Sequence, residues 1–176
     1  GAPALRPIAW ARAPHATVVG ASVTVMAPLG QYEPTRVVNL GYHRWAFKPE
    51  LGVARTLGRW TVDGSAGLWL FTANDRYAPG RSRRTQEPIG SVQGHASYAV
   101  TRRIWVATDT TWFAGGLTRV DGAARGDRQQ NTRVGLTVSV PTFARQSLKV
   151  TWSTGASTRR GSDFDSVMVT WQLVHF

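Results

Sequence analysis

Ionisable side chains occur singly in this sequence, so the chemistry they could do depends on which of them fold together. The four histidines lie far apart, and no pair of them has the spacing of metal ligands. General acid–base chemistry would need two groups among Asp63, His95 and Asp109 within hydrogen-bond reach at one end of the fold. The chain has no Gly-rich phosphate loop and no nucleophile elbow. We therefore expect no catalytic residue, no bound metal and no cofactor.

Composition removes several further classes of site. There are no cysteines, which excludes a disulfide framework and a thiolate metal site. No run of about 18 apolar residues occurs, which excludes a transmembrane helix. Asp163 and Asp165 in the stretch GSDFD could offer carboxylate oxygens to Ca²⁺, but the same residues are typical of a turn at the entry to a strand.

The elements that must position the ionisable side chains are strands, because apolar and polar residues alternate along most of the chain. In 17–27, for example, Val19 and Val23 fall on one face, with Ser22 and Thr24 on the other. About eight stretches of this kind follow one another, each roughly 9–12 residues long, which is the length that crosses a bilayer at a tilt. They are 17–27, 44–55, 60–71, 90–100, 103–113, 132–140, 147–155 and 166–176.

The connections between these stretches alternate between short and long. A transmembrane barrel has short periplasmic turns and longer outer loops, whereas a soluble up-and-down barrel has no reason to collect its short turns at one end. The sequence therefore predicts an all-β, antiparallel, up-and-down transmembrane β-barrel over 17–176, with about eight strands and an N-terminal connecting segment at 1–16. Tight turns are expected near Gly58, at 101–103 and at 141–146, and long loops at 29–44, 72–90, 115–131 and 156–165.

Seven ionisable side chains project from the polar side of the expected strands. A charge in a membrane strand must face water or a partner, because the lipid side penalises it by about 2–4 kcal/mol near the bilayer centre. These side chains could line a pore and set its selectivity, or form cross-strand ion pairs that fill and rigidify the interior. The lumen-lining candidates are Lys48, Glu50, Asp63, His95, Asp109, Arg133 and Lys149.

Aromatic residues fall mainly toward the ends of the expected strands, as in the interfacial girdles of membrane barrels. The alternative is the core of a Trp-rich soluble sandwich, which would carry Lys and Glu on its opposite face. This chain offers mainly Gly, Ser, Thr and Gln there, which suits a narrow wet lumen. The girdle candidates are Trp45, Phe47, Trp60, Phe71, Tyr98, Trp105, Trp112, Phe113, Trp152 and Trp171.

The basic excess, 21 Lys and Arg against 10 Asp and Glu, comes almost entirely from arginine. The arginine-rich stretches RYAPGRSRRTQEP and RVDGAARGDRQQ fall in expected loops, while the aromatics fall in strands. Nucleic-acid sites interleave the two, so we expect no nucleic-acid partner. Loop arginines outside the membrane would instead meet lipopolysaccharide phosphates, which arginine binds bidentately. Phe176 is a candidate assembly signal, because outer-membrane barrels commonly finish on an aromatic that the barrel-assembly machinery recognises.

Five stretches are similar to a known bacterial family. They are VVGASVTVMAPLGQYEPTRVVNLGYHRWAFKPELGVARTLGRWTVD, SVQGHASYAV, WFAGGLTRVDG, NTRVGLTVSVP and GSDFDSVMVTWQ. The family they resemble is named "Putative MetA-pathway of phenol degradation", and the resemblance runs from about Pro3 to Phe176. It implies an outer-membrane barrel and transporter, often encoded near aromatic degradation pathways. Family members are longer, so the chain looks like the C-terminal two-thirds of a barrel of about twelve strands.

These patterns and the resemblance together lead us to expect a bacterial outer-membrane channel or transporter for small hydrophobic or aromatic compounds, and no enzyme. Transport would depend on further strands, because a barrel of about eight strands is mostly filled by its own side chains. If the segment closes alone, a structural or lipid-binding barrel is the alternative. An outer-membrane enzyme is another, and a soluble lipocalin-like binder would show an apolar lumen and a charged exterior.

Overall fold

The computed structural model describes residues 17–36, 38–79, 82–143, 146–160 and 163–173, which form two antiparallel sheets. The large sheet contains β1 (Thr17–Met26), β2 (Ala46–Leu57), β3 (Trp60–Phe71), β5 (Ile89–Ala99), β6 (Trp105–Gly115), β9 (Gln129–Pro141), β10 (Gln146–Thr158) and β11 (Ser166–Leu173). The small sheet contains β4 (Arg84–Gln86), β7 (Thr118–Val120) and β8 (Ala123–Ala124). The prediction of an all-β antiparallel fold with about eight long strands is confirmed. Over the described part of the chain there is no helix that is long and apolar enough to cross a membrane.

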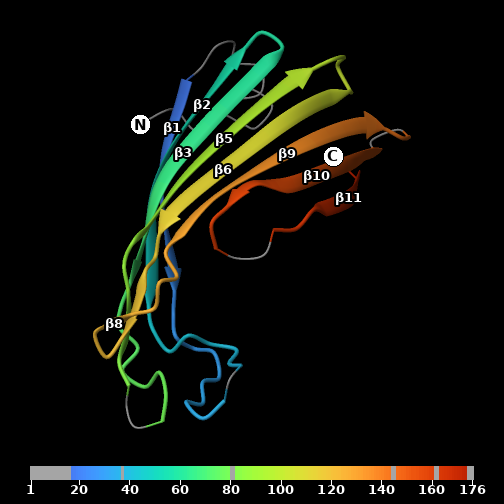
Figure 1. Cartoon of the computed structure of the whole chain (residues 1–176). Helices are drawn as coiled ribbons and strands as arrows, with labels where there is room; N and C mark the ends of the chain where they lie inside the picture. Colours follow the sequence, from blue (N-terminus) through green and yellow to red (C-terminus); the bar gives the residue numbers. More distant parts are fainter. Residues whose placement is uncertain (1–16, 37, 80–81, 144–145, 161–162, 174–176) are drawn as a thin grey trace.

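The large sheet has an up-and-down topology. Its strand order is β1-β2-β3-β5-β6-β9-β10-β11, so each strand pairs with the next long strand of the chain. Figure 1 shows the result, a strongly curved sheet with β1 and β11 at its two edges. Within the described residues these two edge strands pair on one side only, and the sheet is open.

Short and long connections lie at opposite ends of the sheet. The turns from β2 to β3 and from β5 to β6 are at the upper end in Figure 1, and the described parts of the long connections between 27 and 45, between 72 and 88 and between 116 and 128 are at the lower end. In the first turn, Leu57 pairs with Trp60 and only two residues connect them. Gly58 there has a φ of 63°, a left-handed conformation that glycine adopts without strain. The lower end is called the long-loop end below.

The two faces of the large sheet have opposite polarity, and the apolar face is the exposed one. Residues 136–139 of β9 alternate between the two faces. Leu136 and Val138 are 55% and 45% exposed, whereas Thr137 and Ser139 are 6% and 3% exposed. The buried hydrophobic side chains of the described residues are few and small, namely Ala46, Ala107 and Val120. The polar face is therefore the sheltered inner face of the curved sheet. This order is the reverse of that in a soluble domain.

The small sheet lies at the long-loop end and joins the long connections to one another. Asn74 and Arg84 form a bridge in which each backbone N–H donates to the other's carbonyl at 2.8 Å. Asn74 is 2% exposed, and its side chain also donates to the Tyr42 carbonyl at 3.0 Å. The sequence gives no sign of this sheet, because its strands of two or three residues are too short to show a period.

Candidate functional site

The inner face carries all seven of the ionisable residues that the sequence singles out. Residues opposite each other in antiparallel strands point to the same side, so the register defines the face. Asp63 is opposite His95, and His95 is opposite Asp109. Glu50 joins the same face through its pair with Gly67 on β3, and Lys48 lies two residues before Glu50 in β2. Arg133 joins it through Thr111 on β6, and Lys149 through Ser139 on β9. That these residues line a lumen stays a prediction.

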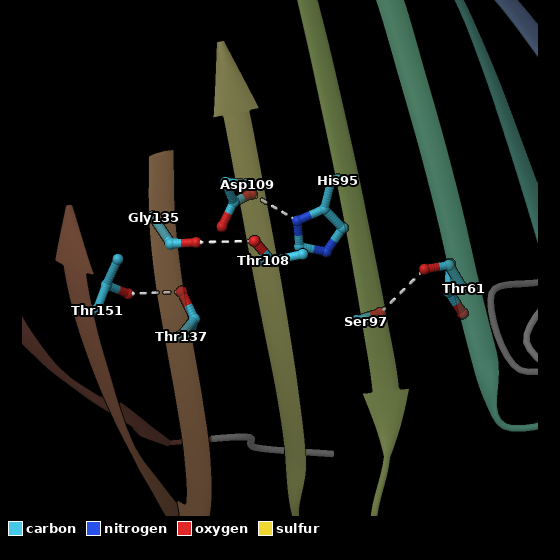
Figure 2. A network of polar contacts seen from close by, with 8 residues as sticks. All are labelled: Thr61, His95, Ser97, Thr108, Asp109, Gly135, Thr137 and Thr151. Atoms are coloured by element: carbon cyan, nitrogen blue, oxygen red, sulfur yellow. Dashed lines mark hydrogen bonds and ion pairs between the residues drawn. The ribbon is translucent and has the colours of Figure 1, made fainter. Parts of the chain in front are cut away.

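Three of the seven form one row across β3, β5 and β6. His95 Nδ1 lies 2.5 Å from Asp109 Oδ1, a hydrogen-bonded pair in which His95 is about one-third exposed and Asp109 about half. Asp63 occupies the next place in the row, on the other side of His95. Figure 2 shows His95 and Asp109 pointing toward each other between neighbouring strands.

Hydroxyl groups surround this row and link the strands through their side chains. Thr137 and Thr151 share a hydrogen bond of 3.0 Å between β9 and β10. Ser97 donates to the Thr61 carbonyl at 3.4 Å (Figure 2). Each hydroxyl can both donate and accept a hydrogen bond, so small polar side chains can satisfy one another's hydrogen-bonding groups on this face.

Lys48 and Glu50 form an ion pair on β2, near the long-loop end. The Lys48 ammonium contacts the Glu50 carboxylate, and their side chains are 13% and 25% exposed. Lys48 Nζ also lies 5.9 Å from the ring centroid of Trp69. Gly67 on β3 leaves the room for this pair, because a Cβ there would lie 2.8 Å from Lys48 Cε.

Arg133 and Lys149 form no hydrogen bond or salt bridge with the other five residues within the described part of the chain. Arg133 donates to the Ser153 hydroxyl at 3.2 Å and to the Phe164 carbonyl at 3.0 Å, and its guanidinium lies 4.2 Å from the Phe164 ring centroid. Lys149 forms no salt bridge within the part of the chain that the structure describes.

The girdle prediction requires an aromatic residue to lie on the outer face and near the end of a strand. It is wrong for four of the ten expected residues, because three lie on the inner face and one lies in the middle of a strand. Phe71, Trp105 and Phe113 lie on the inner face, because the register pairs Trp105 with Ser139 and Phe113 with Ser91, and Phe71 shares the odd-numbered side of β3 with Asp63. Trp152 is on the outer face but in the middle of β10.

A pair of arginines at the long-loop end was missed as a candidate site. Arg44, just before β2, donates through Nη2 to Gln86 Oε1 at 2.5 Å, and its guanidinium lies 4.4 Å from the ring centroid of Phe71. Arg84 on β4 lies 5.0 Å from the ring centroid of Tyr77. Both arginines are half-buried. The expectation that the loop arginines are separated from aromatics is therefore wrong at Arg84, and nothing in the sequence distinguishes Arg84 from its exposed neighbour Arg83.

Two cavities meet at this arginine pair, with volumes of about 510 and 480 Å³. Arg44 and Arg84 line both, together with Gly41 and Tyr42. Burial and the nearby charge of Arg84 lower the pKa of Arg44 to about 10. The first cavity is also lined by Tyr32, Asn74 and Tyr77, and the second by Trp69, Phe71, Gln86 and Gln129.

The remaining sequence candidates contribute little to a site. Asp163 and Asp165 are both exposed. Among the described residues, no group of three or more His, Asp or Glu side chains could hold a metal ion. The candidate assembly signal Phe176 lies outside the described residues, as do His15, His175 and the segment 1–16.

Comparison with known proteins gives one family and one fold. A family model described as "Putative MetA-pathway of phenol degradation" matches residues 1–171. No curated protein matches the sequence. The fold is similar to the crystal structure of an outer-membrane channel from Pseudomonas putida F1, with a TM-score of 0.74 and 24% sequence identity. The match covers 88% of this chain and 58% of that channel, so the chain spans less than two thirds of the channel's length.

Proposed function

The chain belongs to the "Putative MetA-pathway of phenol degradation" family, and from that premise we propose that it forms part of the wall of a bacterial outer-membrane channel. The permeants we propose are small hydrophobic or aromatic compounds. The fold of the P. putida outer-membrane channel supports the barrel architecture. Because the chain covers 58% of that channel, we propose that further strands complete the wall at the edges β1 and β11.

The observation that carries this proposal is the reversed polarity of the sheet. Leu51, Leu136 and Val138 are 66%, 55% and 45% exposed on the outer face, whereas the inner-face residues Thr137 and Ser139 are polar and only 6% and 3% exposed. An apolar surface of this size would aggregate in water, and a lipid bilayer is the solvent that stabilises it. A soluble lipocalin-like binder would have the opposite arrangement.

Aromatic rings on the inner face support an aromatic permeant. Trp69, Phe71, Trp105 and Phe113 stand on the same side of the sheet as the hydroxyls and the ion pairs. Stacking on such rings gives an apolar planar molecule a favourable path through a wet lumen. The Lys48–Glu50 ion pair neutralises two charges that would otherwise hold water tightly, and the Asp109 carboxylate is hydrogen-bonded to His95.

An outer-membrane enzyme is the second candidate, because His95 and Asp109 are within hydrogen-bond reach of each other. We favour a hydrogen-bonded pair that belongs to the wall, since both residues lie within long strands and no other side chain hydrogen-bonds to either of them among the described residues. Asp109→Asn separates these roles. If the pair belongs to the channel wall, we expect the variant to transport aromatic compounds within about twofold of wild type. If Asp109 were a catalytic carboxylate, the same substitution would abolish conversion of the substrate.

Two measurements test the channel proposal. The protein extracted from membranes should need detergent and migrate differently on gels with and without heating, as folded barrels do. A species that stays soluble without detergent contradicts the membrane location. Cells with and without the full-length gene should then differ in uptake of a neutral aromatic compound such as benzyl alcohol. Equal uptake contradicts the channel.

The partners we propose follow from the same placement. The outer face would contact lipid, and exposed loop arginines such as Arg36, Arg76 and Arg83 would pair with lipopolysaccharide phosphates. Insertion would require the barrel-assembly machinery.

A further inference from the structure

Arg44 and Arg84 hold hydrogen-bond donors that the rest of the described structure leaves unused. Arg44 Nη1 and Arg84 Nε are buried and have no hydrogen-bond partner among the described residues. Neither arginine forms a salt bridge there. The two guanidiniums also repel each other. A buried, unpaired charged donor is unfavourable unless something else supplies the acceptor.

The acidic side chains of the neighbouring loops do not supply that acceptor, because other partners hold them. The Asp127 carboxylate accepts hydrogen bonds from the backbone N–H and the hydroxyl of Thr118 at 2.8 and 2.6 Å. Glu87 pairs with Arg119 at 3.3 Å, and Asp75 pairs with Arg83 at 3.2 Å. The charge of Arg84 acts on Asp127 without a direct salt bridge, so the unpaired N–H donors of the two arginines remain available to a ligand.

The surroundings of the pair define the chemistry of that ligand. Both arginines line cavities of about 510 and 480 Å³, which are within the range of about 300–1,000 Å³ for small-molecule sites. Rings of Tyr42, Trp69, Phe71 and Tyr77 line these cavities. A guanidinium binds a planar carboxylate through two parallel N–H···O bonds, and aromatic rings add stacking surface for a planar apolar group.

We propose that Arg44 and Arg84 form a recognition site for aromatic carboxylates at the long-loop end of the barrel. This inference rests on the proposed channel function and narrows its substrate class from aromatic compounds to those that carry a carboxylate. The pair lies where the two cavities meet, so a ligand that passes from the loops toward the strands would meet both guanidiniums.

Binding of benzoate to the full-length protein in detergent tests the proposal. Isothermal titration calorimetry gives the affinity, and the tryptophan fluorescence, to which Trp69 at the second cavity contributes, gives an independent signal. Benzyl alcohol supplies the ring without the charge, and acetate supplies the charge without the ring. We expect benzoate to bind at least tenfold more tightly than either.

Variants then locate the site. Arg84→Gln and Arg44→Gln should each weaken benzoate binding about tenfold or more. Arg84→Lys keeps the charge but loses the planar fork, and should fall between wild type and Arg84→Gln. Arg83→Gln is the matched control, because Arg83 is adjacent in sequence, exposed and paired with Asp75, and it should bind benzoate as wild type does. The heat-dependent gel shift identifies any variant that fails to fold.

Three results would overturn the site: equal benzoate binding by folded Arg84→Gln and wild type, an equal loss in Arg83→Gln, or acetate binding as tight as benzoate binding. Transport across vesicles separates this inference from the channel itself. If benzyl alcohol crosses and benzoate does not bind, the arginine site is wrong and the channel stands. If benzoate binds but neither compound crosses, the channel is wrong and the arginine site stands.

Discussion

A single carboxylate, that of Asp127, holds the start of β7 in place. It accepts two hydrogen bonds from Thr118, whose side chain is 2% exposed. Partial burial raises the pKa of Asp127, but the hydrogen bonds from Thr118 and the charge of Arg84 outweigh burial and lower the pKa below the ordinary value of 3.8. The folded form therefore favours the ionised carboxylate.

The stability that this residue contributes should depend on pH. A carboxyl whose pKa is lowered on folding stabilises the fold at pH values above its unfolded pKa, and this contribution is lost as the pH falls through the folded pKa. We expect faster amide hydrogen exchange in β7 and β8 as the pH falls below about 4, after correction for the intrinsic pH dependence of exchange. Asp127→Asn should lower the free energy of local opening of β7 and β8 by about 1 kcal/mol at neutral pH, which speeds their amide exchange. It should also remove the pH dependence of that exchange.

Asp75→Asn is the control for this prediction, because its side chain is 71% exposed and pairs only with the exposed Arg83. It should leave exchange in β7 and β8 unchanged at every pH. If the exchange of these strands in wild type does not change below pH 4, the two hydrogen bonds to Asp127 do not stabilise them.

At the scale of elements, the junction between β6 and the following long connection depends on one glycine. Gly115 has a φ of 117°, and a Cβ added to it would lie 2.2 Å from the carbonyl oxygen of Pro88, beside the start of β5. Gly115→Ala should therefore destabilise the protein by about 2 kcal/mol or more, through backbone strain and the steric clash. The measurement is the midpoint of urea unfolding in lipid vesicles.

Gly20→Ala is the matched control for that substitution. Gly20 lies in β1, and a Cβ added to it meets nothing within 4 Å. The control should unfold at the wild-type midpoint within error, since alanine in a strand costs no more than glycine. Equal midpoints for Gly115→Ala and wild type would mean that the backbone at Gly115 and Pro88 can move to accommodate a Cβ without loss of stability.

The long strands and their inner face could be predicted from the sequence, whereas the arginine site could not. A two-residue period is a local signal, so Asp63, His95 and Asp109 could be assigned to one face before their partners were known. The contact of Arg84 with Tyr77 depends instead on the path of a long connection through β4, which leaves no periodic trace. The girdle prediction is wrong for Phe71, Trp105 and Phe113 for a related reason. The position of a residue near the end of a strand does not by itself indicate which face of the sheet it occupies.

At the scale of the whole molecule, the sheet has almost no apolar core to hold it together. The described residues include no large side chain that is fully buried, and aliphatic side chains such as Leu51, Leu136 and Val138 lie exposed on the outer face. The backbone pairing of the long strands satisfies the polar groups, but the hydrophobic effect can act only if another medium covers that face. The stability of the molecule should therefore depend on lipid rather than on internal packing.

A charge placed on each face in turn tests this dependence. Leu136 is 55% exposed near the middle of β9 on the outer face, and Gln93 is exposed on the inner face of β5. Leu136→Arg should cost about 2–4 kcal/mol in vesicles, because the guanidinium would be forced into hydrocarbon near the bilayer centre. Gln93→Arg should cost less than about 1 kcal/mol, because its side chain stays in water. Urea unfolding in vesicles measures both, and in a soluble protein both substitutions of exposed residues would be nearly neutral. A Leu136→Arg variant as stable as Gln93→Arg would therefore exclude lipid contact at the outer face.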